Sequence, residues 1–150
     1  MSSATNELYQ QVILDHNKNP RNFKALDHPT CMCEGHNPLC GDHVTVFVNL
    51  EDETLKEITF TGDGCSICKA SASLMTTFLK GKSRTDAKVI FDEFHKMVKG
   101  ELNVETTPHH LGRLTVFQNV SNYPVRVKCA SLAWHAMNSA LDRVTVTSTE

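Results

Sequence analysis

The chain has 150 residues, the length of one domain that buries about two thirds of the surface exposed by its unfolded form. Its residues are 40% hydrophobic and 21% charged, as in soluble globular proteins, and its net charge of -2 argues against the concentrated basic surface that nucleic acids require. No apolar run approaches the roughly 20 residues of a membrane span. We therefore expect a single domain, residues 1–150, with no nucleic acid and no membrane among its partners.

The six cysteines have to be interpreted together with the cellular compartment. Residues 1–7 lack the basic and then apolar pattern of a signal peptide, which predicts a cytoplasmic protein. Thiols stay reduced in the cytosol. The cysteines are therefore expected to be metal ligands, reactive thiols or core residues rather than three disulfides.

The first half of the chain is predicted to form one helix and a small antiparallel sheet. Apolar residues at helical spacing, with Thr5 as the N-cap, predict a helix over residues 5–16. Residues 31–35 are predicted to form a short edge strand. Apolar and polar residues alternate over residues 43–50 and again over residues 55–61, which predicts an antiparallel hairpin.

The chain after this hairpin is predicted to begin a series of helices. A sharp turn that glycine permits at residues 62–64 is followed by a helix from Cys65 up to Gly81. Thr85 or Asp86 is predicted to cap the next helix, because apolar residues then recur at helical spacing.

Two further helices are predicted toward the C-terminal end. A cap followed by proline at residues 107–108 predicts the first of them, and Pro124 opens the second, which carries Cys129. The order of a helix, an antiparallel hairpin and then several helices predicts an α+β domain. We expect a small sheet of about three antiparallel strands packed against several helices.

Three cysteines lie in settings that suit a metal site. Cys40 follows an Asn-Pro turn signal and is separated from Asp42 by Gly41, which can bend the backbone so that thiolate and carboxylate point into one volume. Cys65 lies at a predicted helix start, where the N–H groups and the helix dipole lower the pKa of a thiol. With Cys129, three sulfurs and one oxygen give the ligand count of a tetrahedral zinc ion. The alternative is that each cysteine is a small buried hydrophobic residue.

Two basic residues accompany the third cysteine on the last predicted helix. Three thiolates and one carboxylate around a divalent ion leave an excess of negative charge, which is costly in a partly buried cleft. Lys128 adjoins Cys129, and Arg126 precedes it by three residues. Both are candidates to offset this charge or to position an anionic sulfur species.

Cys68 forms a Cys-x-x-Cys pair with Cys65, the spacing of a redox pair or of half a zinc site. A thioredoxin-like motif would follow a strand of a βαβ unit, whereas the strand here belongs to a hairpin. A helix residue packed beside the site is therefore the favoured interpretation of Cys68. A spare thiol that traps sulfur as a disulfide is the alternative.

Cys31 and Cys33 alternate on the short predicted strand and therefore face the same side. A second metal site there would need two more ligands, and the nearest candidates are His28 and His36. We favour the interpretation without such a site. His43 directly follows the aspartate of the candidate metal site, as an alternative ligand or as a solvated strand residue.

The segments around the three candidate ligand cysteines occur in a specific order that resembles the IscU-type iron–sulfur cluster assembly family, and most closely its SufU branch. The motifs that carry the resemblance are Asn37-Pro38-Leu39-Cys40-Gly41-Asp42, Gly64-Cys65-Ser66-Ile67, Ala70-Ser71-Ala72-Ser73, Arg126-Val127-Lys128-Cys129-Ala130 and Leu132-Ala133-Trp134. The resemblance extends from near residue 7 to near residue 142, and it implies an IscU-like fold.

Two departures from the scaffold members of this family resemble the SufU branch. Lys128 stands where scaffold members have a histidine before the third cysteine. The segment between Cys65 and Cys129 is longer, by a helical stretch around residues 84–105.

The resemblance implies a zinc-dependent sulfurtransferase. Such a protein accepts persulfide sulfur from a PLP-dependent, SufS-like cysteine desulfurase and relays it to downstream iron–sulfur assembly proteins. By this resemblance Cys40, Asp42, Cys65 and Cys129 are the zinc ligands, and Cys40 is the catalytic sulfur acceptor. Zinc keeps a thiol deprotonated but engages its lone pairs, so displacement of Cys40 from the metal would free it for attack.

Two other functions fit the same residues. A scaffold would assemble a transient [2Fe–2S] cluster on them and then transfer it. A small zinc-stabilised protein would carry the metal without any sulfur chemistry. Lys128 and the longer middle segment favour the sulfurtransferase.

Overall fold

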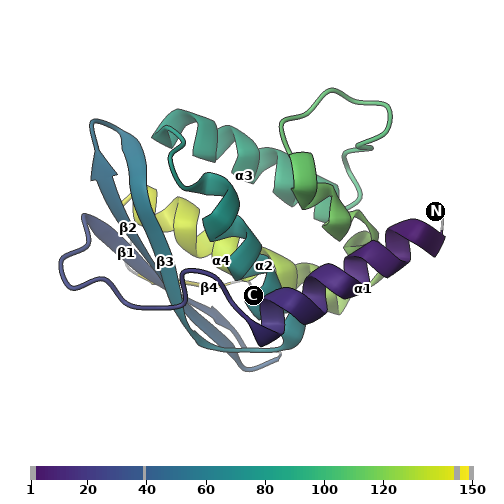
Figure 1. Ribbon diagram of the computed structural model, residues 1–150, viewed down its shortest axis with the longest axis horizontal. Helices are drawn as coiled ribbons and strands as arrows, with labels where there is room; N and C mark the ends of the chain where they lie inside the picture. Colours follow the sequence, from purple (N-terminus) through teal and green to yellow (C-terminus); the bar gives the residue numbers. More distant parts are fainter. Residues whose placement is uncertain (1–2, 39, 144–145, 149–150) are drawn as a thin grey trace.

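The computed structural model describes residues 3–38, 40–143 and 146–148, with side chains for residues 7–38 and 40–143. Its elements follow the predicted order of a helix, a sheet and further helices (Figure 1). They are α1 Ser3–Lys18, β1 Cys31–Asn37, β2 Asp42–Glu51, β3 Thr54–Asp63, α2 Ser66–Leu79, α3 Arg84–Val98, the 3₁₀ helix η1 Gly112–Asn122, α4 Pro124–Leu141 and β4 Val146–Ser148. The predicted α+β class is confirmed.

The sheet has the strand order β3-β2-β1-β4. β1 and β3 both pair antiparallel with β2, as predicted, whereas β4 pairs parallel with β1. The strand predicted at residues 31–35 is confirmed, but its predicted position at the edge of the sheet is wrong, because β4 pairs with β1 over residues 34–36. A strand of three residues has too little pattern to be predicted, and only the fold brings it beside β1.

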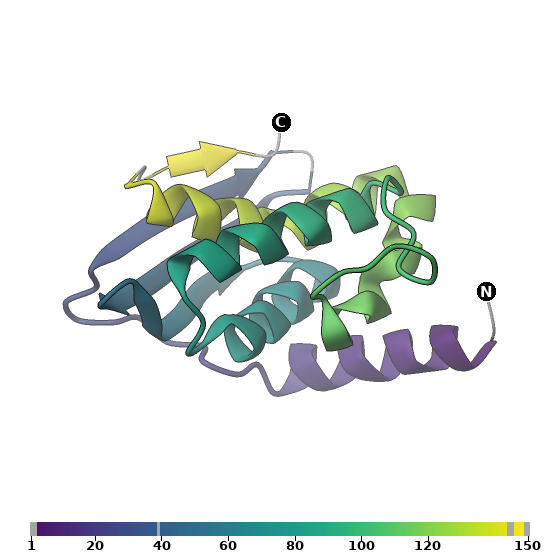
Figure 2. The ribbon, with the colours of Figure 1, turned by 90° about the horizontal axis from the view of Figure 1, so that it is seen from above.

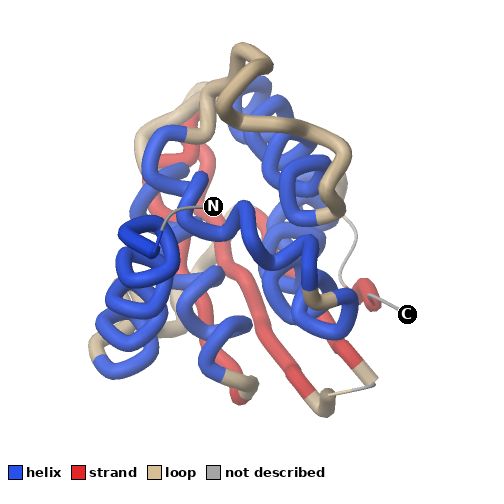
Figure 3. The backbone as a smooth tube through the Cα atoms, turned by 90° about the vertical axis from the view of Figure 1, so that its right-hand side faces the viewer, coloured by secondary structure: helices blue, strands red, loops and turns tan. Residues whose placement is uncertain are grey.

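The helices lie on one side of the sheet (Figures 2 and 3). α2 and α4 pack directly against the strands, while α1 packs on α2 and α3 packs on α4. α4 comes very close to β1 at Gly35, where an added Cβ would lie 3.1 Å from Leu132 Cδ1. At the centre, the ring of Trp134 stacks on Phe94 at 4.3 Å, and its Nε1 donates a hydrogen bond to Ser71 Oγ. None of the described helices is long and apolar enough to cross a membrane.

Two turns around β3 lead the chain toward α2. Asp52 and Glu53 both have positive φ, 51° and 67°, the two-residue turn whose twist matches that of the hairpin strands. At the other end of β3, Gly62 has φ of 135°, and an added Cβ would lie 2.1 Å from the carbonyl oxygen of His43. Glycine is therefore required at residue 62. The chain then turns and reaches Cys65, the N-cap of α2.

Several helix starts differ from the prediction. α1 begins at Ser3, before the predicted cap, and the side chain of Thr5 lies outside the described part. The cap of α3 is Ser83, whose side chain accepts a hydrogen bond from the N–H of Asp86, so neither Thr85 nor Asp86 is the cap.

The helix predicted from residues 107–108 does not form there. The chain stays irregular until η1, because the N–H and the ring of His110 are both held by the carboxylate of Glu93 on α3. This tertiary contact replaces the local cap. The start of α4 at Pro124, in contrast, is confirmed.

Candidate metal centre

Three separate segments meet at an open cleft of about 540 Å³. The β1–β2 loop contributes Cys40, the start of α2 contributes Cys65, and the second turn of α4 contributes Cys129. Residues 122–126, at the junction of η1 and α4, complete the lining. The cleft therefore depends on the antiparallel hairpin, which brings the β1–β2 loop and the end of β3 to the same end of the sheet.

The β1–β2 loop places Cys40 and Asp42 together. Gly41 has φ of 72°, and its N–H donates to the carbonyl oxygen of Asn37 at 2.9 Å. This bend, which favours glycine, brings the ligand atoms of Cys40, Asp42 and Cys129 within 4.8 Å of one another. The predicted function of Gly41 as the bend between thiol and carboxylate thus agrees with the observed backbone.

The remaining distances suit a shared ion. Cys129 Sγ lies 3.6 Å from Cys40 Sγ, and Cys65 Sγ lies 4.0 Å from Asp42 Oδ2. A tetrahedral zinc ion with Zn–S bonds of about 2.3 Å places two sulfur ligands about 3.8 Å apart. Two sulfurs and one carboxylate oxygen thus lie within reach of one ion, whereas Cys65 stands outside this group and approaches it through Asp42. With Cys65 included, the donor set of three thiols and one carboxylate has the chemistry of a zinc site.

The carboxylate of Asp42 is only 3% exposed. The N–H of Cys65 donates to its Oδ1 at 2.9 Å, and the side-chain amide of Asn37 donates to its Oδ2 at 3.4 Å. Within the described residues, no lysine or arginine forms an ion pair with Asp42. A buried carboxylate without a cationic side chain, facing three thiols, is an environment that a bound cation would stabilise.

The thiols of the cleft differ in acidity. The hydrogen bond from Cys129 lowers the pKa of Cys65 to about 6, although burial opposes this effect. The N–H of Cys68 also donates to Cys65 Sγ, at 3.4 Å, at the start of α2. The pKa of Cys129 is raised, because the same hydrogen bond holds its proton and because the residue is buried. Of these two thiols, Cys65 therefore loses its proton first in the metal-free protein.

The sequence prediction missed two residues near the residues of the cleft. Asn37, which it used only as a turn signal, is 1% exposed, and its amide lies 3.7 Å from Cys129 Sγ as well as near Asp42. Burial raises the pKa of Tyr9 on α1, and the charge of nearby Arg126 partly opposes this effect. Asparagine before proline is common in turns and therefore does not signal a residue beside a metal site. Tyr9 on α1 is too distant in sequence from the cysteines to be associated with them.

The other predicted residues at this end of the fold take different positions. Arg126 lines the cleft, whereas Lys128 is half-buried and is absent from the described residues that line it. Cys68 is buried one turn into α2, and burial raises its pKa. Its surroundings are those of a packed helix residue.

The histidines do not join the cysteines of β1. Cys31 and Cys33 face the helices and are buried, and burial raises the pKa of Cys33 to about 11. His36 points to the opposite face of the sheet, as strand alternation requires, so it cannot complete a site with them. His43 also points away from the cleft, on the face opposite to its neighbour Asp42, and therefore does not substitute for it.

Fold and site together define a small α+β protein with three thiols and a carboxylate, all candidate metal ligands, at one end of its sheet. Over residues 8–142 the chain matches the family described as the NifU-like N terminal domain. It belongs to this family, and the resemblance to IscU-type proteins is confirmed.

Its relatives include both branches of the family. The chain is 38% identical to the zinc-dependent sulfurtransferase SufU of Bacillus subtilis, over 89% of this chain and 89% of that protein. It is 36% identical to the iron–sulfur cluster assembly scaffold protein IscU of Streptococcus pyogenes, over 94% of this chain and 87% of that protein. A crystal structure from Fervidobacterium islandicum, described as a scaffold protein for the SUF system, matches with a TM-score of 0.82 and 30% identity, covering 90% of this chain and 97% of that chain.

Proposed function

We propose that this protein is a zinc-dependent sulfurtransferase of iron–sulfur cluster assembly, which takes sulfur from a cysteine desulfurase in the cytoplasm. The observation that carries the proposal is the position of Cys40. It is the exposed cysteine among the six, and it lies at the mouth of a cleft beside two less accessible thiols and a buried carboxylate. An exposed thiol can meet the persulfide of a partner protein, while the other three side chains stay in place.

The four residues divide into one acceptor and three anchors. Asp42 is fixed by two hydrogen bonds, Cys129 is held within α4, and Cys65 is fixed at the start of α2. These three would keep a zinc ion in place. When bound, zinc supplies a positive charge that keeps thiols deprotonated at neutral pH without redox chemistry of its own.

The sulfur transfer that we propose is an exchange between a thiolate and a persulfide. The Cys40 thiolate attacks the terminal sulfur of the protonated persulfide on a PLP-dependent, SufS-like desulfurase. A new S–S bond forms on Cys40, the S–S bond of the donor breaks, and the donor cysteine leaves as a thiolate. The proton stays on the transferred sulfur. Arg126, exposed at the cleft, would stabilise the donor thiolate as it leaves, and Cys40 then passes the sulfur to downstream assembly proteins.

A scaffold function is the second candidate. Relatives from Streptococcus pyogenes and Thermotoga maritima, 36% and 37% identical, are named IscU scaffold proteins. The same three thiols and carboxylate could hold a transient [2Fe–2S] cluster. Lys128, in place of the scaffold histidine, and the helical segment α3 before it favour the sulfurtransferase.

Anaerobic purification separates these candidates first. A colourless protein with one zinc ion per chain is expected for the sulfurtransferase, whereas a brown protein with visible absorption supports the scaffold. Sulfur transfer is then tested by adding the zinc-loaded protein to a desulfurase with cysteine and a reductant. We expect faster sulfide release, and an unchanged rate would leave only a zinc-stabilised protein without sulfur chemistry.

The matched pair of variants Cys40→Ser and Cys31→Ser tests the acceptor. Both exchange the same atoms, but Cys31 is buried on β1, on the face that packs against the helices. Cys40→Ser is expected to abolish the stimulation while the fold is retained, and Cys31→Ser is expected to keep it. Stimulation that survives in Cys40→Ser would show that another residue accepts the sulfur.

A further inference from the structure

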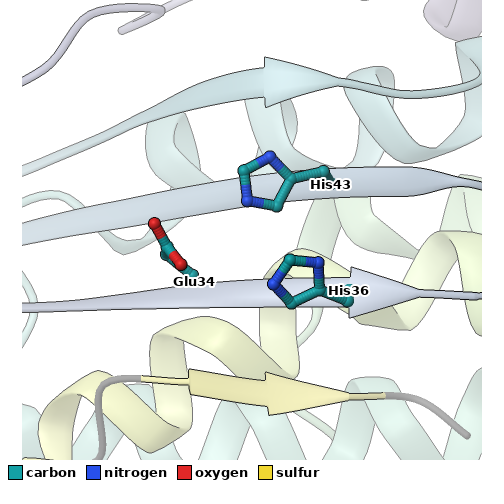
Figure 4. Close-up of side chains that lie close together, drawn as sticks. All are labelled: Glu34, His36 and His43. Atoms are coloured by element: carbon teal, nitrogen blue, oxygen red, sulfur yellow. The ribbon is translucent and has the colours of Figure 1, made fainter.

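A second group of metal-ligand side chains lies on the outer face of the sheet, away from the helices. It consists of Glu34 and His36 on β1 and His43 on β2 (Figure 4). Because alternate residues of a strand share a face, Glu34 and His36 point the same way. The strand register places His43 directly opposite His36. The antiparallel pairing of β1 and β2 thus brings three ligand side chains together.

The geometry of this outer cluster suits one ion. The ligand atoms of the three side chains all lie within 4.8 Å of one another. The two imidazole rings are stacked, with centroids 4.6 Å apart and an interplanar angle of 25°. All three side chains are at least partly exposed, so rotation about their side-chain bonds can bring each ligand atom to the roughly 2.0–2.2 Å of a metal bond.

The charge of the cluster also favours a cation. Within the described residues, Glu34 has no ion pair with lysine or arginine. Two imidazoles and one carboxylate are borderline ligands that prefer Zn²⁺, Co²⁺, Ni²⁺ or Fe²⁺ to Mg²⁺ or Ca²⁺. Three protein ligands leave at least one coordination position for water.

We propose that Glu34, His36 and His43 form a second binding site, for a divalent transition-metal ion, on the outer face of the sheet. The site is separate from the thiol cleft and does not depend on the proposed sulfur transfer. The site lies next to the thiol cleft along β1 and β2, because the next pair of opposed residues is Asn37 and Asp42. An ion that joins His36 to His43 would therefore hold the two strands together at the base of the loop that carries Cys40.

The test adds Co²⁺ to the full-length protein after its thiol cleft has been loaded with zinc. We expect one additional ion per chain, with weak visible absorption from nitrogen and oxygen ligands and no thiolate charge-transfer band. His36→Ala is expected to abolish this binding, and Glu34→Gln to weaken it more than tenfold. His36 is chosen because it is exposed and is not adjacent to a ligand of the cleft.

His28→Ala is the matched control, because His28 is exposed and lies outside the cluster. It should bind the additional Co²⁺ like the unchanged protein. No additional ion in the unchanged protein, or equal binding in His36→Ala, would overturn the proposal. Failure of the desulfurase assay would leave this result unaffected, so the two proposals are tested separately.

Discussion

Cys65 at the cleft and Cys33 on the sheet have opposite acidities in this fold. At the cleft, a hydrogen bond from Cys129 and the N–H groups at the start of α2 lower the pKa of Cys65 to about 6. On β1, where Cys33 is buried, burial raises the pKa of this thiol to about 11. Cys68 shows how local the difference is, because it lies three residues after Cys65 on the same helix and its pKa is raised by burial. Placement at the end of an element, rather than cysteine itself, makes the thiol reactive.

The largest expected difference between the two groups concerns metal binding. Structural zinc sites bind with about 10–16 kcal/mol, so each of four ligands contributes about 2.5–4 kcal/mol. We expect Cys65→Ala and Asp42→Asn each to weaken zinc binding about 10²–10³-fold in competition with a chelator. Cys33→Ala should retain the affinity and instead lower the free energy of unfolding by about 1–2 kcal/mol. Equal zinc affinity in Cys65→Ala and Cys33→Ala would contradict the comparison.

The acidity of Cys65 predicts selective alkylation of the metal-free protein. A thiol reacts as the thiolate, which forms as the pH rises through its pKa. At pH 7 Cys65, with a pKa of about 6, is mostly thiolate, and its thiolate fraction is about 30–90 times that of a thiol with the ordinary pKa of 8.5–9. Peptide mass spectrometry across a pH series should show half-maximal labelling of Cys65 near pH 6. Labelling of Cys33 or Cys68 at the same pH would show that their burial is not as described.

Asn37 connects the two sides of the site and gives a smaller effect. Its amide donates to Asp42 and lies near Cys129 Sγ, so it orients two candidate ligands without being one. Loss of such a supporting contact typically reduces metal affinity by about 10–100-fold. Asn37→Ala should show this loss. Asn49→Ala, which removes an amide bonded to Glu57 elsewhere on the sheet, should leave the zinc affinity unchanged.

Arg126 is expected to have the smallest effect, because it is exposed and its charge is screened by salt. Arg126→Gln should slow the stimulation of a desulfurase about 2–10-fold at low ionic strength, and less at high ionic strength. Lys56→Gln removes a positive charge at the far end of the β2–β3 hairpin and is the control. A loss that does not depend on salt would show that Arg126 acts by packing rather than by its charge.

Local patterns in the sequence were sufficient for the elements that carry the site. Alternating residues predicted β2 and β3, and the glycine turn at residues 62–64 predicted that Cys65 begins α2. Pro124, the first residue of α4, predicted where this helix starts. Each of these signals acts over a few neighbouring residues, which is why they can be recognised in one sequence.

Contacts between distant segments could not be predicted in the same way. β4 exists because it pairs with β1 across more than a hundred residues, and the chain before η1 is shaped by Glu93 on α3. The outer cluster was missed because His36 was considered with the cysteines of its own strand. Only the strand register reveals that His36 faces His43.

The central claim is that Cys40 accepts sulfur while the other cysteines of the cleft hold their places. Peptide mass spectrometry after anaerobic reaction of the zinc-loaded protein with a persulfidated desulfurase tests it most directly. We predict that the mass of one sulfur atom is added to the peptide containing Cys40, and that the peptides with Cys65 and Cys129 are unchanged. Sulfur on Cys65 or Cys129, or on none of the three, would contradict the account.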